Sequence, residues 1–292
     1  MRGGQDGLEL VWFVARDDAA SAGSIDAAGP GAGPGGDGAV AEALAPYVHQ
    51  KLPLDGETRA ALERNGLRLV RVPLSDLGSL ESGLTRVGPR NRDWLGWALE
   101  WREAFRGASI AEGSALMVNG ARTKSWGGTL RVVARAWTAP KVAGEGLRRA
   151  LRVEMAVQLQ ETGRSEGVAA FAAPDPVIDV RREGRVMPGT VIDAELEPGW
   201  AYVLTAERPG VSWGSRSVEE NRGGKDDQGL RFAKPAEGDA PEGALLGPAA
   251  VPPPSVGEAM LTNAARLESG GPVKAVLIFI PRASATPEAS SR

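Results

Sequence analysis

The sequence predicts an α+β fold in which a small N-terminal α/β unit is followed by a mainly antiparallel, β-sandwich-like or barrel-like region with long surface loops. Residues 151–159 alternate apolar and polar side chains, which is the period of a half-buried strand. From about Ser114 onward, short extended runs are separated by glycine and proline, a pattern typical of antiparallel sheets. Before that point strand-like and helix-like segments alternate, which places the α/β unit at the N-terminus.

The N-terminal unit, residues 1–106, begins with an apolar run at residues 8–16 that indicates a strand. Residues 17–38 consist mostly of Gly, Ala, Pro, Ser and Asp. They offer too little apolar surface to offset the entropy lost on ordering, so we expect a disordered loop. An apolar helix disturbed by Pro46 is expected at residues 39–50.

Capping and stop signals define the other elements of this unit. Asp55 is an N-cap candidate for a helix at residues 57–64, and Asn65-Gly66 supplies its C-terminal stop. The remaining predicted elements are a strand at residues 67–72, a short helix capped by Ser75 and reaching Leu84, and a helix at residues 91–105.

Residues 107–208 are predicted to form a β-rich domain. Its first hairpin is expected to pair residues 129–137 with residues 151–159 around a connection at residues 141–146, leaving one face of the sheet in water. The candidate strands are residues 115–119, 129–138, 147–160, 177–181, 190–196 and 201–206.

The C-terminal third is predicted to return to the core after a long excursion. Residues 209–254 are mostly turn formers and charged residues, so a long loop or linker is expected there. Residues 255–281 are predicted to form a helix capped by Ser255, followed by a hydrophobic strand that joins the core. Residues 282–292 are expected to be a disordered tail.

Composition excludes several classes of function. The 34 basic and 37 acidic residues give a net charge of −3 with no long basic run, so no nucleic-acid partner is expected. The chain has no cysteine, which removes disulfides, thiolate nucleophiles and cysteine-ligated metals. Its single histidine, His49, excludes multi-histidine metal sites, and we expect no metal or cofactor.

No apolar run approaches the roughly 20 residues that a transmembrane helix needs, so no transmembrane helix is expected. The apolar residues 8–15 are interrupted by Glu9 and followed by Arg16, Asp17 and Asp18, a pattern that favours a strand over a signal peptide. The expectation is therefore a cytoplasmic protein, or an exported or envelope-associated one if the true N-terminus lies upstream.

No complete catalytic motif can be assembled from the residues present. Gly210-Val-Ser-Trp-Gly214 matches the G-x-S-x-G nucleophile elbow, but that motif requires a histidine after the serine in the chain. The only histidine, His49, precedes Ser212, and it lies at the end of a predicted apolar helix where a half-buried role is common. We therefore lean against an enzyme.

Tryptophan is overused, with 8 Trp against 2 Tyr and 5 Phe. Trp94, Trp97 and Trp101 recur at i, i+3 and i+7, which would place them on one face of the predicted helix. Packing in the core is the favoured interpretation, and a platform for a partner or a sugar is the alternative. The candidate partner or sugar contacts are Trp94, Trp97, Trp101, Trp126 and Trp213.

The leading hypothesis is a non-enzymatic structural or protein-interaction module. An α/β unit followed by a β-rich region is similar in architecture to modules of bacterial envelope and assembly systems, and the Ala, Gly, Arg and Pro bias fits a GC-rich genome. A carbohydrate-binding module that uses exposed tryptophans is the alternative. A carboxylate-dependent glycoside hydrolase comes third, because it requires two carboxylates at a defined separation.

Overall fold

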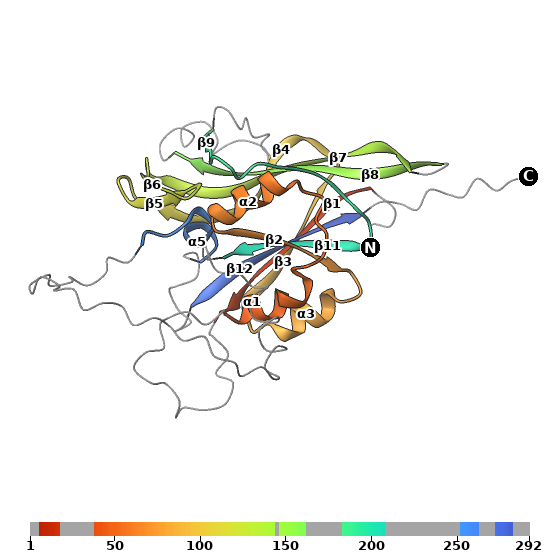
Figure 1. The fold of residues 1–292 in the computed structure, drawn as a ribbon, viewed down its shortest axis with the longest axis horizontal. Coiled ribbons are helices and arrows are strands. Elements are labelled where there is room, and N and C mark those ends of the chain that lie inside the picture. The colour runs from red at the N-terminus through yellow and green to blue at the C-terminus, as the bar shows by residue number, and fades with distance from the viewer. Residues whose placement is uncertain are drawn as a thin grey trace, which may run out of the picture.

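Two antiparallel sheets, called A and B, and a layer of helices are stacked on one another in the protein. In Figure 1, sheet B is at the top, sheet A is in the middle, and helices α1 (Ala39–Leu44) and α3 (Leu77–Gly83) are at the bottom. The structure is a computed structural model, and the residues that it describes are 6–17, 38–143, 146–161, 183–207, 252–262 and 272–282. This arrangement confirms the β-rich, mainly antiparallel α+β class. The described strands do not close into a barrel.

Sheet A has the strand order β2-β11-β12-β1-β3, and all of its neighbours are antiparallel. The apolar strands β1 and β12 lie inside the sheet, whereas β2 and β3 are its edges. Sheet A takes strands from the segments predicted at residues 1–106, 107–208 and 255–281. The strands are β1 (Gly7–Arg16), β2 (Leu67–Pro73), β3 (Arg86–Gly96), β11 (Trp200–Ala206) and β12 (Val273–Arg282).

Sheet B has the order β10-β8-β7-β4, and the short strand β9 also pairs with β8. A separate hairpin of β5 and β6 turns at Asn119 and Gly120, both of which have positive φ. The strands are β4 (Ala98–Ile110), β5 (Ala115–Val118), β6 (Ala121–Lys124), β7 (Gly128–Ala143), β8 (Gly146–Gln160), β9 (Arg185–Val186) and β10 (Ile192–Leu196).

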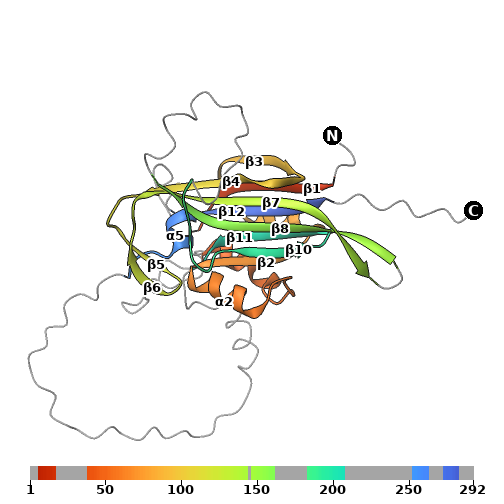
Figure 2. The ribbon, with the colours of Figure 1, turned by 90° about the horizontal axis from the view of Figure 1, so that it is seen from above.

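The predicted hairpin of β7 and β8 is confirmed, and it is longer than expected. Pairing continues to Ala143 and Gly146, through most of the segment where a connection was predicted. The neighbouring strands stop earlier, because β4 reaches only Ala136 of β7 and β10 reaches only Leu151 of β8. The end of the hairpin therefore extends past the other strands of sheet B, as Figure 2 shows.

The main core lies between the two sheets. The alternation predicted for β8 is confirmed, because the five large apolar side chains at alternate positions from 151 to 159 face this core and are at most 2% exposed. Sheet A contributes the side chains on the opposite wall, including Leu10, Tyr202 and Phe279. The residues of β8 in the core are Leu151, Val153, Met155, Val157 and Leu159.

Helices cover the other face of sheet A and one end of the core. The 3-10 turn η1 (Ala45–Tyr47) follows α1 at the predicted disturbance by Pro46. The cap at Asp55 is confirmed, since its carboxylate accepts a hydrogen bond from the Thr58 amide at 2.7 Å. The cap at Ser255 is confirmed as a complete capping box. The helices are α1 (Ala39–Leu44), α2 (Gly56–Arg64), α3 (Leu77–Gly83) and α5 (Val256–Leu261).

Two local predictions are wrong. Residues 91–105 form parts of β3 and β4 instead of a helix, because Gly96 adopts φ +65° and turns the chain from one sheet into the other. Helix α3 begins after Asp76 without a side-chain cap, and Ser75 donates its hydroxyl to the Asp76 carboxylate instead. The strand predicted at residues 177–181 and most of the long loops lie outside the described residues.

Candidate functional site

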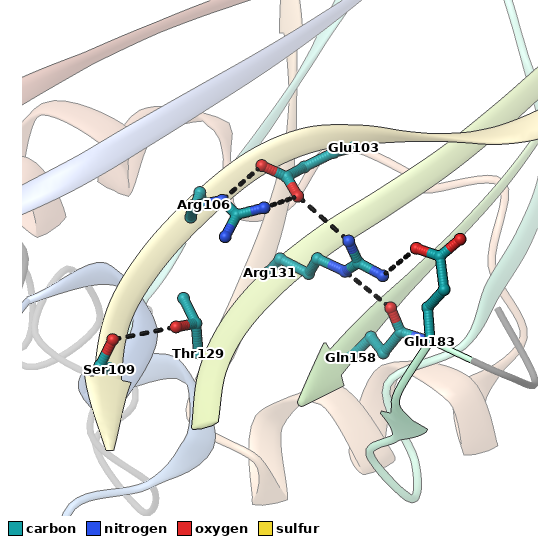
Figure 3. A network of polar contacts seen from close by, with 7 residues as sticks. All are labelled: Glu103, Arg106, Ser109, Thr129, Arg131, Gln158 and Glu183. Carbon is teal, nitrogen blue, oxygen red and sulfur yellow. Dashed lines mark hydrogen bonds and ion pairs between the residues drawn. The ribbon is translucent and has the colours of Figure 1, made fainter. Parts of the chain in front are cut away.

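A buried arginine joins four segments on the outer face of sheet B, the face that points away from the core (Figure 3). Arg131 of β7 is 2% exposed. Its Nε donates to Gln158 Oε1 at 2.7 Å, and its two Nη atoms donate to Glu103 and Glu183 at 3.2 Å each. These partners belong to β4, to β8 and to the segment just before β9, so one guanidinium ties β4, β7 and β8 to one another and to that segment.

The carboxylates of this network balance arginine charges. Glu103 also accepts two hydrogen bonds from Arg106, at 2.8 and 2.7 Å. The hydrogen bonding of Arg106 to the Glu103 carboxylate raises the pKa of the Arg106 guanidinium above its ordinary value. A glycosidase needs one carboxyl group that gives up a proton and a second that attacks or activates water. Carboxylates bound this way to guanidinium groups are better suited to holding strands together.

Two tryptophans share the outer face with this network. Trp101 of β4 is partly buried against a small cluster of Val133 and Ala156. The Arg135 guanidinium lies 5.0 Å from the ring centroid of Trp101 and 5.4 Å from that of Trp137, within the range of cation–π attraction. Trp101 is therefore held in place by neighbours on β7 and β8.

Two further arginines of this face are also paired with carboxylates. Arg135 donates to Glu154 at 2.6 Å, and Arg152 donates two hydrogen bonds to Asp193 at 2.8 and 2.6 Å. The hydrogen bond from Arg152 lowers the pKa of the Asp193 carboxyl below its ordinary value. Among the side chains that the structure describes on this face, opposite charges alternate, so they create no positive field that would bind a polyanion.

The crossover from sheet A to sheet B carries the most exposed apolar side chains of the site. Trp94 is 39% exposed, Trp97 is 65% exposed and Leu99 is 64% exposed. These are three of the five exposed large hydrophobic residues in the described part of the chain. We name this segment of β3 and β4, residues 94–99, the aromatic crossover.

Two glycines position the Trp94 indole. A Cβ atom on Gly7 would lie 2.8 Å from the Trp94 ring, and one on Gly96 would lie 3.0 Å from its Nε1. Both glycines have positive φ, at 155° and 65°. The Trp94 ring therefore packs directly against the backbone of these two glycines, where any larger residue would collide with it. This contact fixes the orientation of the ring at the edge of sheet A.

The predicted contact residues are distributed differently from the sequence expectation. Trp94 lies on edge strand β3, Trp97 at the bend that follows it and Trp101 on edge strand β4, rather than all on one helical face. The exposure of Trp97 contradicts core packing for that residue. Trp126 is exposed after β6, with the Arg185 guanidinium 3.8 Å from its ring centroid. Trp213 lies outside the described residues. Sequence reasoning missed Leu99, because exposure of an apolar residue becomes visible only in the fold.

A separate cavity of about 580 Å³ lies beside edge strand β2, and His49 is one of the residues that line it. It contains one carboxylate, Glu63, which forms an ion pair with Arg68. Its cationic residues, among them Lys51 and Arg59, were not singled out in the sequence, because α2, β2 and the segment between η1 and α2 meet only in the folded chain.

The described residues contain no group of three or more His, Asp or Glu side chains that could hold a metal ion. In the same part of the chain, no helix is long and apolar enough to cross a membrane.

Comparison with protein-family models, curated proteins and solved structures finds no match. The function must therefore be argued from the geometry of the aromatic crossover, the outer face of sheet B and the cavity.

Proposed function

We propose that the protein is a non-enzymatic interaction module that binds a protein partner through the aromatic crossover. The observation that carries this proposal is the exposure of Trp97, at the bend between β3 and β4, and of Leu99, near the start of β4, at 65% and 64%. Large apolar side chains that are grouped on a surface mark interaction sites more often than scattered ones do. Tryptophan is also enriched among the residues that dominate interface energies.

Side-chain anchoring fits this segment better than addition of a partner strand. β4 is an edge strand, but its pairing with β7 contains three register shifts. The adjacent edge strand β3 contains Pro89, and Gly88 there has φ +88°. Bulges and prolines blunt a sheet edge against pairing with another chain. A partner is therefore expected to accept Trp97 and Leu99 in an apolar pocket.

The crossover is also suited to binding because its backbone belongs to two paired strands. β3 is held by β1, and β4 is held by β7. A tryptophan side chain has few rotatable bonds, so it loses little conformational entropy on binding when its backbone is already fixed. Trp94, which rests on Gly7 and Gly96, adds a second oriented ring at the same turn.

A carbohydrate ligand is the second candidate, because exposed indoles can stack on sugar rings. Sugar hydroxyls need hydrogen-bond partners once they are removed from water. Leu99, the most exposed neighbour of Trp97, offers none, and the exposed ring of Trp126 already has a guanidinium 3.8 Å from its centroid. These features favour a protein partner.

Photo-crosslinking tests the proposal. Benzoylphenylalanine is placed at Leu99 in cells that naturally make the protein, and at Val191, which is 51% exposed near β10, as a matched control. We expect a discrete, protease-sensitive adduct from position 99 that position 191 does not give. The same adducts from both positions, or none from position 99, would contradict a protein contact there, and an adduct removed by glycosidases would favour the carbohydrate alternative.

A further inference from the structure

The cavity beside β2 lies at the opposite edge of sheet A from the aromatic crossover. Its inner wall is apolar, formed by the buried side chains of Leu52, Leu62, Leu67 and Leu69. Its volume of about 580 Å³ falls within the range of small-molecule sites, which is about 300–1,000 Å³. The cavity is therefore large enough for a small organic ligand with an apolar body.

The charged residues of the cavity are predominantly cationic. Lys51, Arg59 and Arg68 line it together with a single carboxylate, Glu63. Arg68 is neutralised by ion pairs with Glu63 and with Glu207, the latter at 3.2 Å. Within the described part of the chain, the side chains of Lys51 and Arg59 have no ion-pair partner. Two positive charges therefore remain available in a concave site.

The segment that carries Lys51 is anchored to the sheet. Arg71 of β2 donates from Nη1 to the Lys51 carbonyl oxygen at 3.1 Å. The guanidinium of Arg71 also lies 3.8 Å from the ring centroid of Trp200, on the neighbouring strand β11. The Gln50 amide donates to the Tyr47 carbonyl at 3.0 Å, which ties the segment to η1. The cavity is thus preformed, as ligand sites usually are.

We propose that this cavity binds a small organic carboxylate, with its carboxylate between Lys51 and Arg59 and its apolar body against the leucine wall. Charge complementarity selects the anion, because Lys51 and Arg59 line the cavity and have no ion-pair partner among the described residues. The leucine wall, which is the apolar inner wall formed by Leu52, Leu62, Leu67 and Leu69, selects a ligand with an apolar part over an inorganic anion. This site is independent of the proposed protein contact.

Ligand-observed NMR titration with benzoate tests the site, and benzamide, which has nearly the same shape and no charge, is the matched ligand control. The charge-reversal variants are Lys51→Glu and Arg59→Glu. Lys124→Glu, on the exposed strand β6, is the matched protein control. Thermal unfolding of each variant checks that it is folded, and Arg59→Gln replaces Arg59→Glu if the latter is not.

We expect benzoate to bind at least about tenfold more tightly than benzamide, and each cavity variant to weaken benzoate at least about fivefold while Lys124→Glu leaves it unchanged. Equal binding of benzoate and benzamide would overturn the proposal, as would benzoate affinity that is insensitive to Lys51 and Arg59. Inorganic phosphate that competes as well as benzoate would overturn the role of the leucine wall.

Discussion

At the scale of single residues, Arg131 shows how a buried charge can stabilise a sheet. Each of its three donor nitrogens has an acceptor, on Gln158, Glu103 and Glu183. The planar guanidinium reaches three directions at once, which an ammonium group cannot do with the same geometry. The alternation of β8 places Gln158 on this outer face, but no local pattern in the sequence identifies its partner on β7.

We expect Arg131→Ala to lower the free energy of unfolding by about 2–3 kcal/mol, because Gln158 loses a donor and the partly buried carboxylates of Glu103 and Glu183 each lose one arginine partner. Arg131→Lys should recover less than half of that loss. Urea denaturation measures both values, and Arg106→Ala serves as a more exposed control. Equal losses for Arg131→Ala and Arg106→Ala would show that the buried network does not tie the strands together.

Glu9 of β1 forms ion pairs with Arg92 and Arg282 in sheet A, and these contacts depend on pH. Burial by itself raises the pKa of the Glu9 carboxyl, but hydrogen bonds and charges from Arg92 and Arg282 outweigh burial and hold the pKa below its ordinary value of 4.5. The carboxylate form is therefore favoured in the folded protein. Its stabilisation is fully present above the unfolded pKa and is lost as the pH falls through the folded pKa.

The variant Glu9→Gln tests this linkage, because glutamine keeps the shape and removes the charge. We expect Glu9→Gln to be less stable than wild type at pH 7, and the difference to shrink when urea denaturation is repeated at about pH 3. A difference that stays constant or grows on acidification would mean that Glu9 is not stabilised as a carboxylate.

At the scale of elements, a close junction joins the end of α2 to the start of α5. Gly66 follows α2 with φ +69°, and a Cβ atom there would lie 2.0 Å from Ser255 Oγ. The Gly257 amide donates to the Asn65 carbonyl at 2.8 Å across the same junction. The Asn65 side chain also accepts a hydrogen bond from the Asn119 amide, so this buried residue links α2 to the β5–β6 hairpin.

We expect Gly66→Ala to destabilise the protein by about 3 kcal/mol or more, through both the left-handed backbone and the collision with the Ser255 cap. Gly78→Ala is the matched control, since Gly78 lies in α3 and no atom lies within 4 Å of its added Cβ. It should be neutral or stabilising by up to about 1 kcal/mol. Similar melting temperatures for the two variants would contradict the close approach at Gly66.

Elements with strong local signals could be predicted from the sequence, and elements decided by distant partners could not. The caps at Asp55 and Ser255 and the alternation of β8 depend on a few adjacent residues. The spacing of Trp94, Trp97 and Trp101 fits a helix equally well, but pairing of β3 with β1 and of β4 with β7 decides for strands. Tertiary context overrides local propensity in such segments.

At the scale of the whole molecule, the order of the strands was beyond sequence reasoning. β12 lies between β1 and β11, so the centre of sheet A is assembled from three distant parts of the chain. No periodicity encodes which strands pair across such separations. The candidate sites depend on the same long-range assembly. The sequence indicates Trp94 and Trp97 as candidate contacts. No sequence pattern indicates Leu99, Arg131 or the cavity residues Lys51 and Arg59.

We propose that Trp97 belongs to a binding surface, and its side chain lies outside the core. Because it is 65% exposed, we expect Trp97→Ala to change the free energy of unfolding by less than about 1 kcal/mol. A core tryptophan would lose about 3–5 kcal/mol on the same change. Stability and partner binding should therefore separate in this variant.

The most direct test is the yield of the cross-linked adduct from position 99 in a Trp97→Ala background, compared with the yield in a Val191→Ala background. Both residues are exposed and apolar, and they lie apart in the chain: Trp97 is at the bend between β3 and β4, and Val191 lies just before β10. We expect the adduct to fall at least about tenfold with Trp97→Ala, as for an interface anchor, and to remain unchanged with Val191→Ala. Equal yields in the two backgrounds would contradict the assignment of the aromatic crossover as the contact surface.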